Sequence, residues 1–439
     1  MSLNSRTAIS HCVLACLFAA SMTHSHAKNV TSYQSALQKV QAYQSENELG
    51  QQREQLAELN QKQSRLWQNP SLNIEQSGFE SGQEKELSIG ISQPLDIFGQ
   101  RKLDRTRAET SSQQMQLQQQ LWNAQSQLIV KFAWSQLMIT ELEQRIYVAQ
   151  MKVSQANLES VEKRYRVGSI ALVDFERAQI ESLEIKRLQQ QALLKLHAAK
   201  RQLSNLWGES NNQVSTQTDV VAWPDQSEQT VQNYITQGWL EKLYVLNLKQ
   251  ANYQIDNLKI KGRSQPTLNI GMTSTQTPEE KDDTALVVGV ELPLNLFNRQ
   301  QYTIPMAQKQ QLLINQQQQR ELQQQILDIA NQLQQLKGLK NQNEAVSTQI
   351  KLAENVQKRT LQGFQAGKFS LTDIQQSTMQ LQNLRLAQLE LLSRAWQTAL
   401  SAEALSIGTT FEDISRSDAY SQLHKKATEA TQNLINWGN

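Results

Sequence analysis

The sequence predicts a mainly α-helical protein that carries a small set of antiparallel β-strands and is built from two similar halves. Three observations predict this fold. Long stretches contain neither glycine nor proline, four short runs alternate apolar with polar residues, and both patterns occur twice along the 439 residues. Helices repeat every 3.6 residues and strands every 2, so the two kinds of element can be told apart from the sequence.

The composition favours long hydrated helices. The chain contains 16 glycines and 7 prolines, which is few for its length, and it is rich in glutamine, an uncharged helix former. Its net charge is +2 and no block of basic residues stands out. Nucleic-acid binding depends on clustered Lys and Arg, so we expect no nucleic-acid partner.

Residues 1–27 have the layout of a secretory signal peptide. Arg6 supplies a positive start, residues 12–22 are mostly apolar, and Ser25-His26-Ala27 places small residues at the −3 and −1 positions. We therefore expect cleavage between Ala27 and Lys28. Val13-Leu14-Ala15-Cys16 resembles a lipobox, so lipidation of Cys16 is the alternative.

Candidate sites for chemistry are scarce in the mature chain. Both cysteines lie within residues 1–27, so cleavage leaves no disulfide, thiolate ligand or cysteine nucleophile. His197 and His424 remain, too far apart in sequence to suggest a metal motif. A glycine-rich phosphate loop and a Gly-x-Ser-x-Gly motif are both lacking. We expect no enzyme activity, no cofactor and no resident metal.

An internal duplication organises the sequence. Pro94-Leu95-Asp96-Ile97-Phe98 recurs 199 residues later as Pro293-Leu294-Asn295-Leu296-Phe297, and the pairs Gly168/Gly367 and Asp174/Asp373 keep the same offset. Asn69-Pro70-Ser71-Leu72 resembles Gln265-Pro266-Thr267-Leu268 at an offset of 196. We divide the mature chain into a first repeat (28–222), a second repeat (223–408) and a polar tail (409–439).

Each repeat contains two runs with a period of two residues, as expected for strands with one apolar and one polar face. The runs can reach about ten residues, which suffices for a tilted strand to cross a membrane. Polar loops near 78–84 and 275–283 join them, and a surface hairpin on a globular domain is the alternative. The apolar positions are Leu72, Ile74, Leu87, Ile89, Ile91, Leu268, Ile270, Met272, Leu286, Val288, Val290 and Leu292. The opposite face includes Asn73, Glu75, Ser88, Ser92, Asn269, Thr273 and Glu291, with Val287 as an exception.

The helices are long and carry a heptad-like pattern. Residues 101–166 lack Pro and Gly, and at 1.5 Å per residue they would extend about 100 Å. Apolar or small residues recur every three or four positions, which indicates a coiled-coil seam with one stutter. A generic two-stranded coiled coil is the alternative. The seam consists of Leu117, Leu121, Ala124, Leu128, Phe132, Ser135, Ile139, Leu142, Ile146, Ala149, Val153 and Ala156, and that of the second repeat of Leu322, Ile326, Ile329, Leu333 and Leu336.

The long helices are predicted to end at glycines. Gly168 and Gly367 fit the left-handed position that terminates a helix. Ser370-Leu371-Thr372-Asp373 reads as a capping box, whereas Ala171 replaces the capping serine in the first repeat. We expect returning helices over 171–207 and 371–407. Helices are predicted over 28–68 and 228–262, before the strands, and we expect them to stack end to end on the returning helices.

With these features the chain resembles the TolC-type outer-membrane factors over residues 30–408. Asn69-Pro70-Ser71-Leu72 and the run from Ser92-Gln93-Pro94 to Gly99-Gln100-Arg101 are similar to the heavy-metal, CzcC-like branch. Asn298-Arg299 in the second repeat departs from Gly99-Gln100, and Ala171 departs from the capping serine.

The resemblance implies a homotrimer, in which four antiparallel transmembrane strands per chain form a 12-stranded barrel and long helical hairpins form a coiled-coil tunnel in the periplasm. The polar strand positions given above would then face the pore, and the apolar positions would meet outer-membrane lipid. It implies an exit channel of a tripartite efflux system, exporting heavy-metal cations, with a periplasmic adaptor and an inner-membrane RND transporter as partners. A multidrug or type I secretion channel is one alternative, and a structural periplasmic coiled-coil protein with its hairpins packed on helices is another.

The same resemblance places adaptor docking and the gate at the turns 166–174 and 365–373. The residues concerned are Arg166, Gly168, Asp174, Gly367, Lys368, Ser370 and Asp373. Together with Arg164, the charged ones would form ion pairs or an acidic ring, whereas capping alone explains the glycines and aspartates without a partner. The sequence leaves the tail undecided between wrapping the tunnel and disorder.

Overall fold

The computed structural model describes residues 30–46, 49–79, 84–209, 213–216, 221–277 and 282–436. The expected cleavage between Ala27 and Lys28, the alternative lipid site Cys16, and the tips of both strand loops lie outside these residues. The described part of the chain contains no helix with both the length and the apolar character needed to span a membrane.

The two halves of the chain have the same order of elements. The first half contains α1 (Tyr33–Glu46), α2 (Leu49–Gln63), β1 (Ser71–Ser77), β2 (Lys85–Pro94), α3 (Gln100–Arg166) and α4 (Leu172–Asn205). The second contains α5 (Ser227–Gln237), α6 (Trp239–Lys261), β3 (Thr267–Gln276), β4 (Asp283–Glu291), α7 (Thr303–Gln365) and α8 (Leu371–Ser406). Two further helices follow, α9 (Phe411–Ser415) and α10 (Ala419–Asn436).

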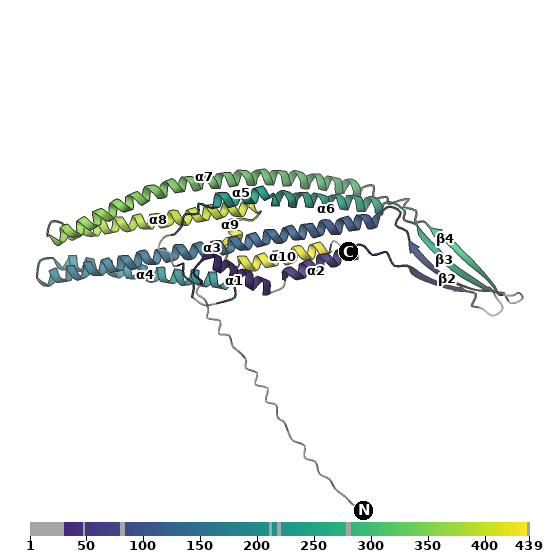
Figure 1. Cartoon of the computed structure of the whole chain (residues 1–439), viewed down its shortest axis with the longest axis horizontal. Coiled ribbons are helices and arrows are strands. Elements are labelled where there is room, and N and C mark those ends of the chain that lie inside the picture. Colours follow the sequence, from purple (N-terminus) through teal and green to yellow (C-terminus); the bar gives the residue numbers. More distant parts are fainter. Residues whose placement is uncertain are drawn as a thin grey trace, which may run out of the picture.

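The molecule is elongated, with the sheet at one end and the α3–α4 and α7–α8 turns at the other (Figure 1). Helix α4 packs along the half of α3 nearer the turn, and α2 packs nearer the sheet. Helices α8 and α6 accompany α7 in the same way. Each long helix is therefore accompanied by shorter helices placed end to end, as we expected.

The predicted helix before β3 is interrupted. Residues 227–261 form two helices because Gly238, with φ of 60°, adopts the left-handed conformation between them. In the first half, α1 ends at Glu46 and α2 begins at Leu49 and ends at Gln63. The prediction of one helix over 228–262 was therefore wrong, and the helix predicted to reach residue 68 ends at Gln63, so the residues directly ahead of Pro70 are not helical.

The predicted seam on α3 holds over its first half and then shifts. Its positions are buried from Leu117 to Ile139, but Ala149 and Ala156 are exposed. The buried positions there are Tyr147, Gln150, Ser154 and Val161. Gln150 donates a hydrogen bond to Gln382 of α8. Because polar side chains make this contact between α3 and α8, the apolar seam did not predict it. In the second seam Ile329 and Leu336 are buried while Ile326 is exposed.

The main hydrophobic core lies midway along the helices, where α1, α3, α8 and α9 meet. Leu128 and Leu400 are 2% and 0% exposed there. Lys131 Nζ lies 2.5 Å from the Oε1 atom of Glu403, which is 1% exposed, so a buried charge is paired across α3 and α8. Apolar burial at this level joins the two halves.

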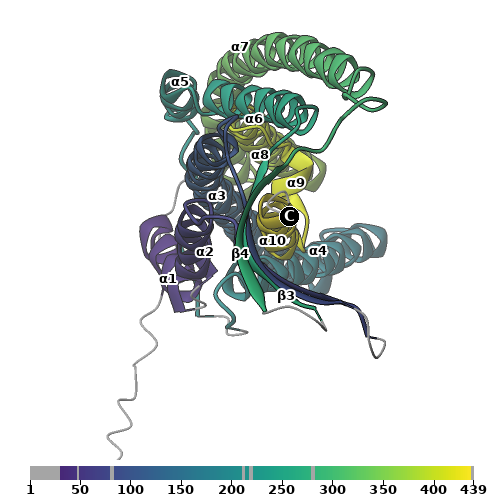
Figure 2. The same cartoon turned by 90° about the vertical axis from the view of Figure 1, so that its right-hand side faces the viewer.

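The tail is helical. Helix α9 packs against α3 and α8, with Ile414 1% exposed and the Phe411 ring edge-on to Phe132 at 5.7 Å between centroids. Helix α10 runs along α3 towards the sheet (Figures 1 and 2). Over α9 and α10 the tail is therefore ordered and packed on the helical body, and of the two options disorder does not apply to these helices.

The strands form one antiparallel sheet in the order β1-β2-β3-β4. Each predicted run is a strand, and β2 pairs with β3 across the two halves. The sheet extends beyond the ends of the helices (Figure 1). The alternative in which the strand hairpins pack on helices is therefore wrong.

Candidate channel surfaces on the sheet and at the helical turns

The polar face of the sheet is formed mainly by β1, β2 and β3, whereas β4 adds Ala285, Val287 and Gly289 beside Glu291. Residues opposite each other in an antiparallel pair share a face, and Glu75 lies opposite Ser88, which lies opposite Thr273. Asn73 Nδ2 donates to Ser92 Oγ at 2.6 Å, and Thr273 Oγ1 donates to Ser88 Oγ at 3.2 Å. The register thus brings all seven predicted polar positions to one face: Asn73, Glu75, Ser88, Ser92, Asn269, Thr273 and Glu291.

The other face of the sheet is apolar and exposed. Ile91, Ile270 and Val288 lie in one row across three strands and are 54%, 48% and 63% exposed. Val287 lies opposite Gly271 on the polar face, as the sequence indicated. A contiguous exposed apolar surface of this kind is typical of a lipid or protein contact.

Both helical turns have the predicted backbone geometry. Gly168 and Gly367 each have φ of 75°. Ser169 N donates to Arg164 O at 2.9 Å and Lys368 N donates to Gly363 O at 2.8 Å, which are the backbone bonds that close a helix with a left-handed glycine. The prediction of glycine-terminated helices is confirmed.

The two returning helices start differently. Ser370 Oγ accepts from Asp373 N at 3.2 Å, and the Asp373 carboxylate accepts from Ser370 N at 2.8 Å. These bonds form the predicted capping box, and the hydrogen bond from the Ser370 hydroxyl lowers the pKa of Asp373. Ala171 provides no side-chain cap to α4.

The remaining charges at the turns are engaged locally. Arg166 pairs with Glu162 on its own helix, and Arg177 Nη1 lies 3.6 Å from Asp174 Oδ1. Lys368 is exposed. Within the described chain, the expected ion pairs among Arg164, Arg166, Lys368, Asp174 and Asp373 do not form, because each aspartate is closest to partners in its own helical turn.

Three contacts between the two helical hairpins were missed by the sequence analysis. Arg164 Nη2 donates to Phe364 O at 3.1 Å while its guanidinium lies 3.8 Å from the centre of the Phe364 ring. Gln375 Nε2 donates to Glu181 at 2.9 Å, and burial raises the pKa of this glutamate. The third contact is the Gln150–Gln382 bond. Partners about 200 residues apart leave no local pattern to detect.

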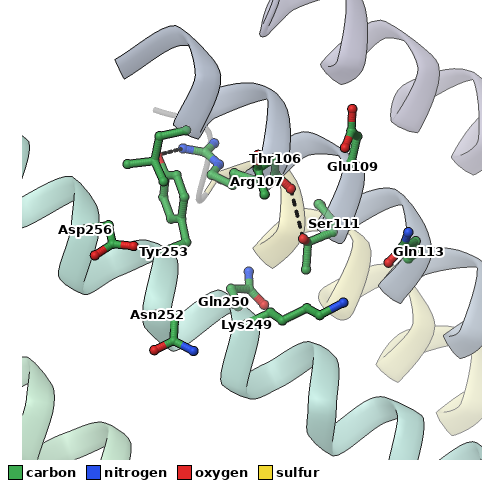
Figure 3. A pocket seen from close by; sticks show the side chains of 12 residues that line it. Thr106, Arg107, Glu109, Ser111, Gln113, Lys249, Gln250, Asn252, Tyr253 and Asp256 are labelled. Atoms are coloured by element: carbon green, nitrogen blue, oxygen red, sulfur yellow. Dashed lines mark hydrogen bonds between the residues drawn. The ribbon is translucent and has the colours of Figure 1, made fainter. Parts of the chain in front are cut away.

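A polar groove lies between α3 and α6, with a volume of about 370 Å³ (Figure 3). Arg107 Nη1 donates to the Tyr253 hydroxyl at 3.3 Å, and that hydroxyl donates to Asp104 at 3.0 Å. Burial raises the pKa of Tyr253. Lys249 and Glu109 also line the groove, so charges of both signs face water along the helical wall.

Metal ligands do not cluster in the part of the chain that the structure describes, where no group of three or more His, Cys, Asp or Glu side chains is arranged to hold an ion. His197 is exposed on α4, and His424 lies on α10, where burial lowers its pKa.

The chain thus combines a long helical body with a four-stranded sheet that has one exposed apolar face and one polar face. No protein-family model matches the chain. Among curated proteins, it is 22% identical over 356 residues to the cobalt-zinc-cadmium resistance protein CzcC of Cupriavidus metallidurans, covering 78% of this chain and 82% of that protein.

Solved structures show the same fold. CusC superposes with a TM-score of 0.66 at 16% identity, covering 87% of this chain and 92% of CusC. The outer-membrane protein VceC of Vibrio cholerae gives 0.63 at 15% identity, covering 86% and 96%. The outer-membrane channel OprN gives 0.65 at 12% identity, covering 87% and 90%. The chain has the fold of the TolC-type outer-membrane channels, and the resemblance to this family predicted from the sequence is confirmed.

Proposed function

We propose that this protein is the outer-membrane exit channel of a tripartite RND-type efflux system that exports heavy-metal cations. The observation that carries the proposal is the sheet, which exposes an apolar face and carries polar residues of β1, β2 and β3 on the other. Such a sheet is stable in a membrane when the apolar face meets lipid and the polar face meets a water-filled pore. The helical body then lies in the periplasm.

The assembly proposed is a homotrimer. Three copies of the four-stranded sheet give twelve strands, an even number as bacterial outer-membrane barrels have. The shared element order of residues 28–222 and 223–408 supports a duplication, in which each half contributes one strand hairpin and one helical hairpin. Three chains would then surround one tunnel with helical hairpins of similar shape.

The helical turns are proposed as the docking site of a periplasmic adaptor, which connects to an inner-membrane RND transporter. They lie at the end of the molecule farthest from the sheet (Figure 1), which supports this placement. Arg166 and Lys368 are exposed, and Gly168, Gly367, Ser370 and Asp373 hold the turn geometry that presents them. Asp174, in the first turn of α4, is included in the proposed docking site and pairs with Arg177.

The substrate proposal follows the similarity to CzcC, a cobalt-zinc-cadmium resistance protein. The polar face of the sheet offers Asn, Ser, Thr and Glu side chains rather than thiolates or imidazoles. Such hard or neutral ligands do not select soft cations. Selection among cations therefore belongs to the transporter, and the channel conducts what it receives.

The decisive experiment is cellular accumulation of zinc, cobalt, cadmium, copper and a fluorescent dye in a deletion strain, with and without the gene restored. Metal retention that the restored gene reverses is expected. Dye retention alone would keep the channel but overturn its metal substrate in favour of a multidrug channel. Recovery of the protein in the periplasmic fraction rather than in the outer membrane would overturn the channel itself.

Proteolytic processing is tested separately by the mass of the mature protein. Cleavage between Ala27 and Lys28 predicts a chain that begins at Lys28, whereas a diacylated species beginning at Cys16 would indicate a lipoprotein.

A further inference from the structure

Basic side chains gather where the sheet meets the helices. Four segments of the chain lie there, 64–70, 93–105, 258–266 and 292–302, between the strands and the ends of α2, α3, α6 and α7 (Figure 1). These segments hold eight Lys and Arg residues but two acidic ones, whereas the whole chain has 43 basic and 41 acidic residues. We call the eight the basic collar: Arg65, Arg101, Lys102, Arg105, Lys259, Lys261, Arg263 and Arg299.

The positive charge of the basic collar is largely uncompensated. Asp96 accepts hydrogen bonds from backbone N–H groups in the first turn of α3, the nearer at 2.6 Å, and Asp104 accepts from a tyrosine hydroxyl at 3.0 Å. Within the described chain, Lys259 is the one member of the collar in a salt bridge, which it forms with Asp256 at 2.8 Å. Every member except Arg101 is exposed, so the boundary presents a net positive surface.

Exposed rings and apolar side chains lie among these charges. The Arg101 guanidinium lies 3.9 Å from the centre of the Trp67 ring, and the Trp67 side chain is 65% exposed. The same four segments expose further apolar or aromatic residues: Leu66, Ile97, Leu292, Leu294, Leu296, Phe297 and Tyr302. Aromatic rings beside Lys and Arg are typical of the layer where a bilayer meets water, because the rings enter the headgroup region while the cations reach lipid phosphates.

The opposite end of the sheet carries the opposite charge. The described residues beside the two strand loops include Glu84, Glu86, Asp282 and Asp283, and Lys85 is the one basic residue among them. In the channel proposed above, both ends of the sheet lie at a membrane surface. Positive charge therefore marks the helical side of the membrane and is not a general feature of the sheet ends.

The apolar face of the sheet runs into the basic collar. Val290 and Leu292 continue that face to the end of β4 and are 65% and 51% exposed. Arg299 lies in the segment after β4, and Arg263 lies in the segment before β3. A soluble anion would engage the charges alone. A phospholipid engages both surfaces, because its acyl chains cover the apolar face while its phosphate reaches the cations beside it.

We propose that the basic collar binds anionic phospholipid headgroups in the membrane leaflet next to the helical body. The proposal rests on the channel function proposed above and adds the class of lipid that the boundary recognises. Five of the eight members are arginine, whose guanidinium holds phosphate through two parallel hydrogen bonds. Attraction to an anionic lipid surface extends over about 8–10 Å at physiological salt, so it acts on charges at this boundary and not on those farther along the helices.

Lipid selectivity in a bilayer tests the collar directly. The full chain, as recovered from the outer membrane, is reconstituted in phosphatidylcholine bilayers with a trace of spin-labelled phosphatidylglycerol or phosphatidylcholine of matching acyl chains. Electron paramagnetic resonance measures the fraction of each labelled lipid that is immobilised at the protein surface. At low salt, phosphatidylglycerol should be preferred about three-fold or more. The preference should disappear in 1 M salt, where the Debye length falls to about 3 Å.

A variant with four collar charges removed identifies the residues responsible. It combines substitutions at four exposed positions, which keep a polar side chain of similar length: Lys102→Gln, Arg105→Gln, Lys261→Gln and Arg263→Gln. We expect this combined variant to lose most of its preference for phosphatidylglycerol at low salt. The salt series needs no substitution, so it decides the question even if the combined variant fails to assemble.

The matched control removes the same charge from the helical body. It changes two lysines and two arginines that are exposed on α4 and α7, away from the sheet: Lys186→Gln, Arg201→Gln, Lys351→Gln and Arg359→Gln. The control should keep the wild-type lipid preference. A loss as large as that of the collar variant would assign the preference to net charge and overturn the collar as a site.

The outcomes separate this proposal from the channel function. Equal immobilisation of both lipids by the wild-type protein would overturn lipid recognition, leave the channel standing and point to another partner for the collar, such as an acidic protein surface. A preference that survives high salt or the combined substitution would also overturn the proposal. Absence of any immobilised lipid would mean that the chain does not insert in the bilayer, which would overturn both proposals.

Discussion

Helices α3 and α7 occupy the same position in the two halves of the chain, yet one is a central element and the other an edge. Of the 67 residues of α3, 23 are buried. Of the 63 residues of α7, five are buried: Ile329, Leu336, Leu339, Ala353 and Phe364. Helix α3 packs against helices of both halves and the tail, whereas α7 packs against α6 and α8.

The difference shows that equivalent sequence patterns do not produce equivalent environments in a single chain. Helix α7 has apolar residues at helical spacing, but Leu313, Leu327 and Leu352 are 65%, 58% and 62% exposed. Helix α4 and helix α2 on the opposite edge also expose leucines, including Leu194 and Leu59. These surfaces are the ones that the proposed trimer would bring together.

Matched leucine-to-alanine substitutions on α3 and α7 should give the largest difference in stability between the two helices. Leu128→Ala removes a fully buried side chain of α3 and should lower the free energy of unfolding of the subunit by about 2–5 kcal/mol. Leu327→Ala, on exposed α7, should change it by less than about 0.5 kcal/mol while weakening the trimer. Urea titrations followed by tryptophan fluorescence, with trimer content from unboiled gels, separate the two effects. An equal loss of subunit stability in both variants would show that α7 is not an edge.

The end of α7 offers a second test. Gly367→Val forces a β-branched residue into the left-handed conformation at φ of 75°, at a cost of about 1–2 kcal/mol or more. We expect the turn to be disrupted and efflux abolished while the trimer still assembles. Gly367→Asn is the control, because asparagine tolerates this conformation and should retain efflux. Normal export by the Gly367→Val variant would show that efflux does not require this turn.

The caps of the returning helices sharpen the comparison between the two hairpins. Ser370→Ala should cost about 1 kcal/mol because it deletes the hydroxyl that accepts from Asp373 N. Ala171→Ser should stabilise the start of α4 by a similar amount, since no side chain caps it now. Hydrogen exchange of the first-turn amides of α4 and α8 measures both changes. If the first turn of α8 stays better protected than that of α4 in the variants Ser370→Ala and Ala171→Ser, packing rather than capping sets the difference in protection.

The smallest expected effect is a pH dependence at the contact between α4 and α8. Burial raises the pKa of Glu181 above its ordinary value of 4.5, so the folded state holds its proton more tightly than the unfolded state. The stabilisation is complete below pH 4.5 and is lost as the pH rises through the raised pKa. Glu181→Gln should remove this dependence and keep a partner for Gln375. Thermal unfolding at a series of pH values is the measurement, and an unchanged slope in the variant would assign the dependence to other groups.

The sequence alone determined the features that depend on local chemistry. The strand positions, their two faces, the glycine-terminated turns and the capping box at Ser370 all follow from neighbours within a few residues, where period and backbone preference decide. The break between α5 and α6 at Gly238 also depends on local chemistry, but the sequence analysis placed this glycine inside one predicted helix, 228–262.

Only the tertiary structure decided which of these surfaces are covered. The buried Gln150, the Arg164–Phe364 contact and the pairing of β2 with β3 join residues far apart in the chain. No period encodes such contacts, because they depend on which helix lies alongside. The difference between exposed Phe297 and half-buried Phe98 has the same origin. Two nearly repeated motifs differ because one meets the next repeat within its own chain and the other reaches the chain's edge.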